Sequence, residues 1–129
     1  MNAHATLGKL APECVHPNAP QVEESLLQRF RALTDLTGSI SDASDALGLA
    51  CTIPASILAP ISSARIVGTA LTVRNIGRDT QVYKAASDRD NRMGEIEAHH
   101  LARAGDVLVI EGLTGVSNLG GQSASIGSR

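Results

Sequence analysis

Four glycines follow a short apolar segment near the end of the chain. Residues 107–110 are all apolar, and the glycines after them are Gly112, Gly115, Gly120 and Gly121. Glycine lets a ligand approach the backbone because no Cβ stands in the way. If a strand precedes this loop and a helix follows it, the free N–H groups of the helix N-terminus favour an anion. The segment is therefore either a cradle for a small anion or a tight packing turn.

The glycine spacing restricts which anion such a loop can take. It does not match the G-x-G-x-x-G pattern of dinucleotide sites, and no Lys-Ser or Lys-Thr pair follows, so a P-loop is not supported. A small carboxylate suits the short loop better than a dinucleotide does. Ser117, Ser123 and Ser125 have no His-Asp arrangement that the sequence reveals, so a serine nucleophile is not supported either.

Other titratable residues are interpreted structurally. Glu95 and His99 are four apart on an expected helix and share a face, whereas Glu97 and His100 point elsewhere. No third ligand has a convincing spacing, so we interpret this segment as a solvated helix face and not as a metal site.

Three further charged features lie outside this helix. We interpret Asp42 and Asp45 as helix-capping residues. Residues 87–92 form an expected exposed charged turn. Arg74 ends an expected strand, and its side chain either meets a ligand or faces solvent.

Composition excludes several classes of function. The chain has 129 residues, which fits one small domain, and a net charge of −2, which provides no basic stripe for duplex DNA. Phe30 and Tyr83 are its only aromatic residues, so bases have no stacking platform. No segment has the length of a bilayer span, and the start does not resemble a secretory signal. We expect Cys14 and Cys51 to be free thiols in the cytoplasm.

The expected elements divide the chain into an irregular arm, residues 1–20, and a domain, residues 21–129. One amphipathic helix occupies the segment up to Thr34, and a second starts at a Ser39 or Ser41 cap and stops near Gly48. Prolines 54 and 60 break the segment that follows, which we expect to be loop or a short edge.

The second half of the chain supplies the two strands that we expect. A β-branched run indicates a strand over residues 65–74, and residues 107–110 indicate one buried on both faces beside parallel neighbours. Residues 76–93 are helix or excursion, residues from 94 to before 105 are helical, and a helix of small residues starts near 121, suited to close packing on a sheet. The fold class is α/β. Because two strands make only a marginal sheet, the rest must come from a continuation or another chain.

Four segments, taken in order, resemble the RraA-like family. They are residues 37–48, 64–75, 102–112 and 118–125, and the resemblance extends from about Thr34 to Arg129. The family includes 4-hydroxy-4-methyl-2-oxoglutarate aldolases, oxaloacetate decarboxylases and the regulator of ribonuclease activity A. Older names call some members dimethylmenaquinone methyltransferases.

The resemblance implies a swivelling β/β/α-type fold, assembled as trimers or hexamers with active sites between subunits. It implies that backbone N–H groups of Gly120, Gly121, Gln122 and Ser123 hold the pyruvate-like end of a 2-oxo acid. It also implies that a later strand supplies an Arg-Asp pair, whose arginine binds substrate and whose aspartate helps to hold a divalent metal, usually Mg²⁺, through water.

Two departures from the family pattern shape the functional expectation. No Arg-Asp pair follows the turn, and Arg129 is not its arginine, so we expect the metal ligands outside this segment, in a longer, processed or companion chain. Gly121 stands where the aldolases carry an acid, which affects aldol cleavage more than decarboxylation. The expected function is a metal-dependent lyase that yields pyruvate, with its catalytic residues unidentified. The alternative is a non-catalytic interaction or regulatory protein on the same scaffold.

Overall fold

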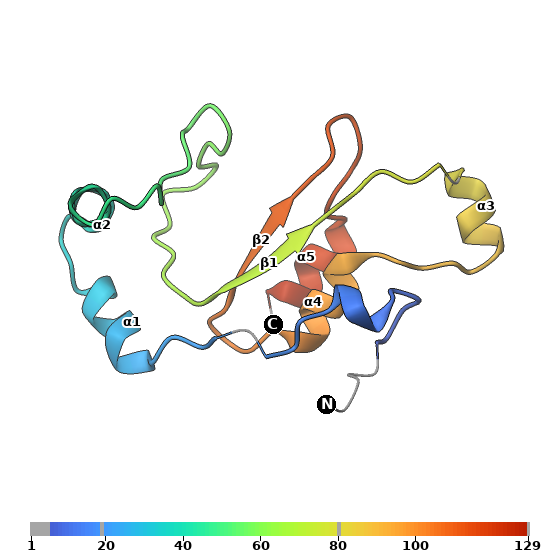
Figure 1. Ribbon diagram of the computed structural model, residues 1–129, viewed down its shortest axis with the longest axis horizontal. Helices are drawn as coiled ribbons and strands as arrows, with labels where there is room; N and C mark the ends of the chain where they lie inside the picture. The colour runs from blue at the N-terminus through green and yellow to red at the C-terminus, as the bar shows by residue number, and fades with distance from the viewer. Residues whose placement is uncertain (1–5, 19, 80, 129) are drawn as a thin grey trace. The chain divides into compact units, whose positions relative to one another are not determined.

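The computed structural model describes residues 6–18, 20–79 and 81–128, so residues 1–5 of the expected arm and Arg129 lie outside the described residues. The described chain is mixed α/β, with five α-helices and a two-stranded parallel sheet (Figure 1). In order, the elements are η1 (Pro12–Cys14, a 3-10 helix), α1 (Glu24–Arg31), α2 (Leu36–Ala46), β1 (Ala70–Arg74), α3 (Val82–Ser87), α4 (Gly94–Leu101), β2 (Val107–Glu111) and α5 (Gly121–Gly127). They belong to two compact units, Met1–Pro20 with Thr69–Arg129, and Gln21–Gly68.

The sheet of the first unit is a parallel pair, as the apolar run of β2 predicted. Its register runs from Ala70 opposite Val107 to Arg74 opposite Glu111. One further bond lies at each end, because Val107 N donates to Thr69 O at 2.8 Å and Asn75 N donates to Glu111 O at 2.9 Å. The prediction that the first strand starts at residue 65 was wrong. β2 has five residues and offers residues 65–68 no partner.

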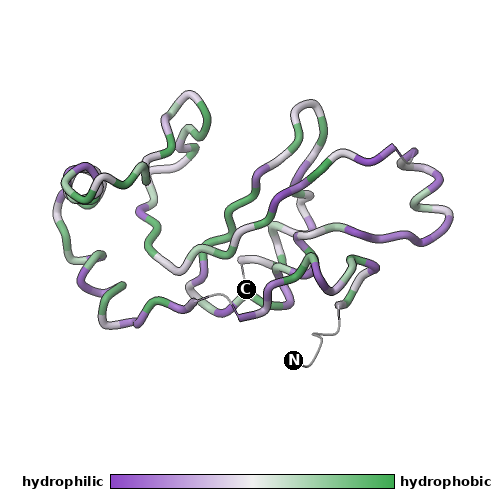
Figure 2. Tube along the Cα trace, in the orientation of Figure 1, coloured by the Kyte–Doolittle hydropathy of each residue, from purple (hydrophilic) through white to green (hydrophobic). Residues whose placement is uncertain are grey.

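The apolar residues of β2 are half-buried. We expected residues 107–110 to be buried on both faces, but each keeps intermediate exposure. Figure 2 shows the hydrophobic stretch that β2 contributes to the strand pair. A sheet of two strands leaves part of each strand without a covering layer, and this accounts for the difference.

Close backbone approaches set the packing of α4 and α5. A Cβ on Gly94 would lie 2.8 Å from Val73 Cγ1, so glycine lets the first turn of α4 approach β1. A Cβ on Gly127 would lie 3.1 Å from His99 Cε1, which brings α5 against α4. Figure 1 shows the two helices side by side. Gly127 thus allows the close packing that we expected of the small residues of α5. Its partner is helix α4, whereas we expected the sheet.

The N-terminal arm is attached to α4 by a buried carboxylate. Glu97 is 3% exposed, and its two oxygens accept from Gly8 N at 2.7 Å and Leu7 N at 3.1 Å. Lys9 N donates to Asn91 O at 2.7 Å. Hydrogen bonds to an ionised acceptor are stronger than neutral ones, so Glu97 holds the arm in place.

In the second unit, α1 is the expected amphipathic helix in a shorter form. Of its leucines, Leu27 is buried and Leu26 is exposed, and Leu33, which we expected in the same helix, lies beyond its end and is exposed. The segment after α1 is held by Arg65, whose guanidinium donates to Leu33 O at 2.6 Å and to Thr34 O at 2.9 Å. These bonds satisfy carbonyls just beyond the helix end.

The start of α2 differs from expectation. Asp35 is the N-cap, and its Oδ1 accepts from Gly38 N at 3.1 Å. Ser39 and Ser41 lie inside the helix and do not cap it. An aspartate three residues before a free N–H makes the same bond as a serine and also adds favourable charge at the helix N-terminus.

The other two aspartates of this segment are not caps. Asp42 and Asp45 are exposed residues within α2, so their interpretation as capping residues was wrong. The helix end agrees with the prediction. Gly48 has φ +68°, a left-handed conformation that glycine adopts without strain, and it follows the C-cap Leu47.

Two further observations concern the cysteines and the length of the helices. Cys14 and Cys51 are free and exposed. Among the described residues, none of the helices has both the length and the apolar character needed to cross a membrane.

The Asp35 cap provides a test of the second unit. We expect Asp35→Ala to lower the free energy of unfolding by about 1 kcal/mol, because Gly38 N loses its acceptor. Urea unfolding followed by circular dichroism measures this change. Asp42→Ala is the matched control, since it removes an exposed carboxylate from the same helix, and an equal loss in both variants would contradict the assignment.

Candidate functional site

The carboxyl ends of β1 and β2 meet at one edge of the sheet, where parallel α/β folds commonly bind ligands. Asn75 follows β1, and Gly112 follows β2. Residues 112–120 form the loop, and α5 begins at Gly121. The strand, glycine loop and helix therefore occur in the predicted order.

Asn118 organises the loop through four hydrogen bonds. Its Oδ1 accepts from Leu113 N at 2.8 Å and from Asn75 Nδ2 at 3.2 Å. Its Nδ2 donates to Leu113 O at 2.9 Å and to Val116 O at 3.1 Å. One amide side chain thus satisfies backbone groups on both sides of the loop and connects it to the end of β1.

The glycines of the loop divide into two roles. A Cβ on Gly112 would lie 2.6 Å from Asn118 Cγ, and Gly115 has φ +82°, so these two serve the tight turn. A Cβ on Gly120 or Gly121 would meet nothing within 4 Å. This second pair borders open space, where a ligand can approach the backbone.

The predicted substrate-binding residues lie together at the start of α5. Gly120 is the N-cap, with φ −84° and ψ 162°, and no side chain caps the helix. Gly120, Gly121 and Gln122 are exposed and Ser123 is half-buried. Ala124 N donates to Gly120 O at 3.0 Å, which closes the first turn of the helix. The N–H groups of residues 121–123 lie in this turn, where a helix offers them no acceptor. They can donate to a carboxylate.

The charges at this edge of the sheet are paired with each other. Arg74 Nε donates to Glu111 Oε2 at 2.5 Å across the strand pair. This hydrogen bond and the charge of Glu111 raise the pKa of Arg74 above its ordinary value. The Arg74 side chain is 74% exposed, so Arg74 and Glu111 form a solvent-exposed ion pair. Exposed pairs contribute little stability.

The interpretation of α4 as a solvated face was wrong. Glu95 and Glu97 are each 3% exposed, because α4 packs on β1 and α5 and the arm covers Glu97. His99 Nε2 is buried without a hydrogen-bond partner in the described structure.

The described residues do not fit a divalent metal. Among them, no group of three or more His, Cys, Asp or Glu side chains is placed to hold one. The acid nearest in sequence to the glycine loop, Glu111, pairs with Arg74, and Glu97 accepts from the arm.

Sequence reasoning missed Asn75 and Asn118. Each carried a weak signal, since one asparagine directly follows a strand and the other stands among the loop glycines. Asparagine is common in turns for many reasons, and only the parallel pairing brings these two side chains together.

The role of Asn118 leads to a second test. We expect Asn118→Ala to lower the free energy of unfolding by about 1–3 kcal/mol, because Leu113 N and two carbonyls lose their partner. We also expect faster hydrogen exchange at the Leu113 amide, measured by NMR. Ser117→Ala is the control in the same loop. Unchanged exchange at Leu113 in the Asn118 variant would show that other contacts hold the loop.

Asn118 and the turn of residues 120–123 together form an edge with exposed backbone donors and internally paired charges. No protein-family model, curated protein or solved structure matches the chain. Membership of the RraA-like family therefore stays a prediction from the sequence motifs.

Proposed function

We propose that this chain supplies the substrate-binding part of an RraA-like lyase with a swivelling β/β/α-type fold. Its substrate is a small 2-oxo dicarboxylic acid, cleaved or decarboxylated to pyruvate. The observation that carries the proposal is the uncapped first turn of α5, which presents exposed amides at the carboxyl edge of a parallel strand pair. The family resemblance supports the proposal independently of this geometry.

In this proposal, the amides of residues 121–123 bind the carboxylate at the pyruvate end of the substrate. The helix dipole adds about 0.3–1 kcal/mol for an exposed charge. Asn118 holds the loop so that these donors are ordered before the substrate arrives, which lowers the entropic cost of binding. The chain therefore orients the 2-oxo acid by the carboxylate at its pyruvate end.

The proposed reaction uses a divalent metal, with Mg²⁺ the expected ion. When bound, the metal supplies stabilisation of the pyruvate enolate. The proposal assigns its ligands to residues outside this segment, because the described residues contain no suitable group. Decarboxylation is favoured over aldol cleavage, since Gly121 replaces the acid that the resemblance links to proton handling.

The proposal includes assembly into a homotrimer or hexamer in the cytoplasm, with or without a companion chain that carries the rest of the domain. Among the described residues, the buried apolar side chains are those of Leu27, Leu36 and Ala98. Residues 107–110 keep intermediate exposure. So small a buried core favours further burial between chains. It favours equally the alternative, a non-catalytic interaction protein.

Assembly is tested by native mass spectrometry of the purified chain. We expect the mass of three or six copies, because association covers the half-buried strand pair. A denaturing measurement on the same sample detects any co-purifying polypeptide. A single copy at micromolar concentration with no second polypeptide would contradict the assembly.

Binding at the turn is tested by removing a single N–H group. Gly121 is the first residue of α5, a position that accepts proline, and the extended N-cap suits a residue before proline. We expect Gly121→Pro to weaken oxalate or pyruvate binding at least about fivefold, as the loss of one hydrogen bond to a charged group requires. Gly121→Ala keeps the N–H group and is the matched control.

The measurement is a titration followed by the amide NMR signals of residues 120–123. Equal affinities of the two variants, or shifts confined to other residues, would contradict carboxylate binding at this turn. Pyruvate release from oxaloacetate by the assembly with any co-purifying polypeptide, with and without Mg²⁺ and against a protein-free blank, then separates a lyase from an interaction protein.

A further inference from the structure

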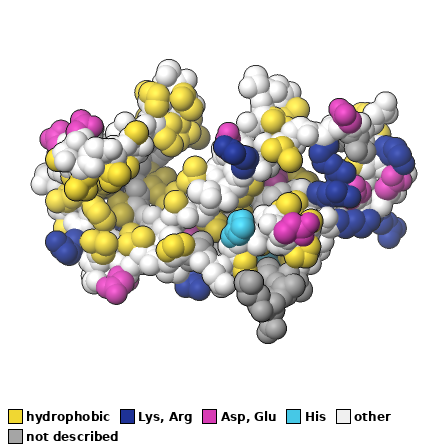
Figure 3. Space-filling model, viewed as in Figure 1, with side chains coloured by type: hydrophobic (Ala, Val, Ile, Leu, Met, Phe, Trp, Pro, Cys, Tyr) yellow, Lys and Arg dark blue, Asp and Glu magenta, His cyan; other side chains and the backbone are white. Residues whose placement is uncertain are grey.

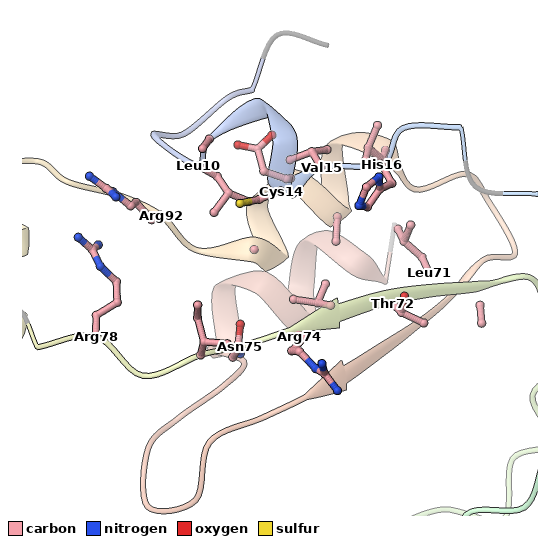
Figure 4. A pocket seen from close by; sticks show the side chains of 18 residues that line it. Leu10, Cys14, Val15, His16, Leu71, Thr72, Arg74, Asn75, Arg78 and Arg92 are labelled. Atoms are coloured by element: carbon pink, nitrogen blue, oxygen red, sulfur yellow. The ribbon is translucent and has the colours of Figure 1, made fainter. Parts of the chain in front are cut away.

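A cavity of about 530 Å³ lies in the first unit, away from the turn of α5. The arm around η1 forms one side of it and β1 the opposite side, and the rest comes from α4 and from the segments that follow β1 and precede α4. Figure 4 shows Leu10, Val15 and His16 facing Leu71 and Thr72 across the cavity. Its size falls within the range of small-molecule sites.

The arm side of the cavity is fixed by hydrogen bonds. Glu97 accepts from Leu7 N and Gly8 N, and Lys9 N donates to Asn91 O at 2.7 Å. A Cβ on Gly8 would lie 2.9 Å from Asn91 O, so the backbones meet closely there. These contacts fix the backbone of the arm directly before Leu10, which lines the cavity.

The middle of the cavity is apolar. Its lining includes the half-buried side chains of Leu10, Val15, Leu71, Val73 and Leu101. An apolar chain of moderate length gains free energy by leaving water for such a lining.

One end of the cavity carries an uneven set of charges. Arg92 Nε donates to Asp90 Oδ1 at 2.9 Å, and Arg78 Nη2 donates to Asp90 Oδ2 at 3.2 Å. Both arginines line the cavity and lie together at one end of it (Figure 4). The hydrogen bond from Arg92, which has the larger effect, and the one from Arg78 hold the pKa of the Asp90 carboxyl below its ordinary value. Two cations thus share one carboxylate.

The other charged residues of the lining already have partners. Arg74 pairs with Glu111, and the Glu97 carboxylate accepts from backbone N–H groups of the arm. Figure 3 shows Lys and Arg side chains, with Asp and Glu side chains among them, on the side of the view where Figure 1 places α3. Each guanidinium has five N–H donors, and Asp90 is bonded by one nitrogen of each. N–H donors of both guanidinium groups are therefore left for an anion at this end of the cavity.

We infer that this cavity binds an amphiphilic monocarboxylate, with its apolar chain between the arm and β1 and its carboxylate at Arg78 and Arg92. Two guanidinium groups share one carboxylate at this end, and their planar shape suits the two oxygens of a further carboxylate. The site is separate from the turn of α5, so it does not depend on the proposed lyase reaction.

Octanoate is the probe, and 1-octanol is its uncharged counterpart. We expect octanoate to bind at least about tenfold more tightly than 1-octanol in calorimetric titrations, because only the acid makes charge-assisted hydrogen bonds. Arg78→Gln and Arg92→Gln each remove one guanidinium and should weaken octanoate binding about fivefold or more. Arg103→Gln is the matched control, since it removes an exposed arginine outside the cavity.

Cys14 reports on the same cavity in the chain without altered arginines. It lines the cavity and is exposed, so in a Cys51→Ser variant it is the single thiol that iodoacetamide can alkylate. We expect octanoate to slow alkylation of Cys14 and 1-octanol at the same concentration to slow it much less. Equal binding of acid and alcohol, equal affinities of the arginine variants and Arg103→Gln, or no protection of Cys14 would each overturn the inference.

Discussion

The parallel pairing of β1 with β2 is the constraint on which the first unit depends. It joins residues 70–74 to residues 107–111 and fixes their register. This register places Arg74 beside Glu111 and brings Asn75 to Asn118, so it arranges the edge of the sheet where the turn of α5 lies. The same pairing holds β1 in place as one side of the cavity. A slip of one residue would reverse every side chain and remove both arrangements.

Two polar side chains extend this arrangement beyond the strands. Asn118 satisfies backbone groups of the loop that leads to α5, and Glu97 attaches the N-terminal arm to α4. Each replaces water around backbone groups that neither helix nor sheet can pair, which is a general requirement for ordered loops. Asn118 orders the loop of one candidate site, and Glu97 orders the arm beside the other. The turn of α5 offers backbone donors in open space, whereas the cavity offers an apolar lining with a cationic end.

Local patterns predicted much of the fold. The apolar run at residues 107–110 indicated a strand with a parallel neighbour, and Gly48 marked the end of α2, because both signals depend on residues close in sequence. The errors involve distant partners. The first strand begins at Ala70 and not at Arg65, since pairing needs a strand opposite, and Asp35 caps the helix that Ser39 or Ser41 was expected to start. Glu95 and Glu97 are buried by contacts with other elements, and the periodicity of the helix itself does not reveal such contacts.

The sequence by itself determined the α/β class and the order of strand, glycine loop and helix, and the family resemblance proposed residues 120–123 as anion donors. Periodicity, β-branching and glycine content are properties of short segments, so they can be recognised without knowledge of the fold. Only the tertiary structure decided which glycines serve the turn and which border open space, and that Arg78 and Arg92 share Asp90 beside an apolar cavity. These features depend on contacts between residues far apart in the chain, and such contacts exist only once the chain has folded.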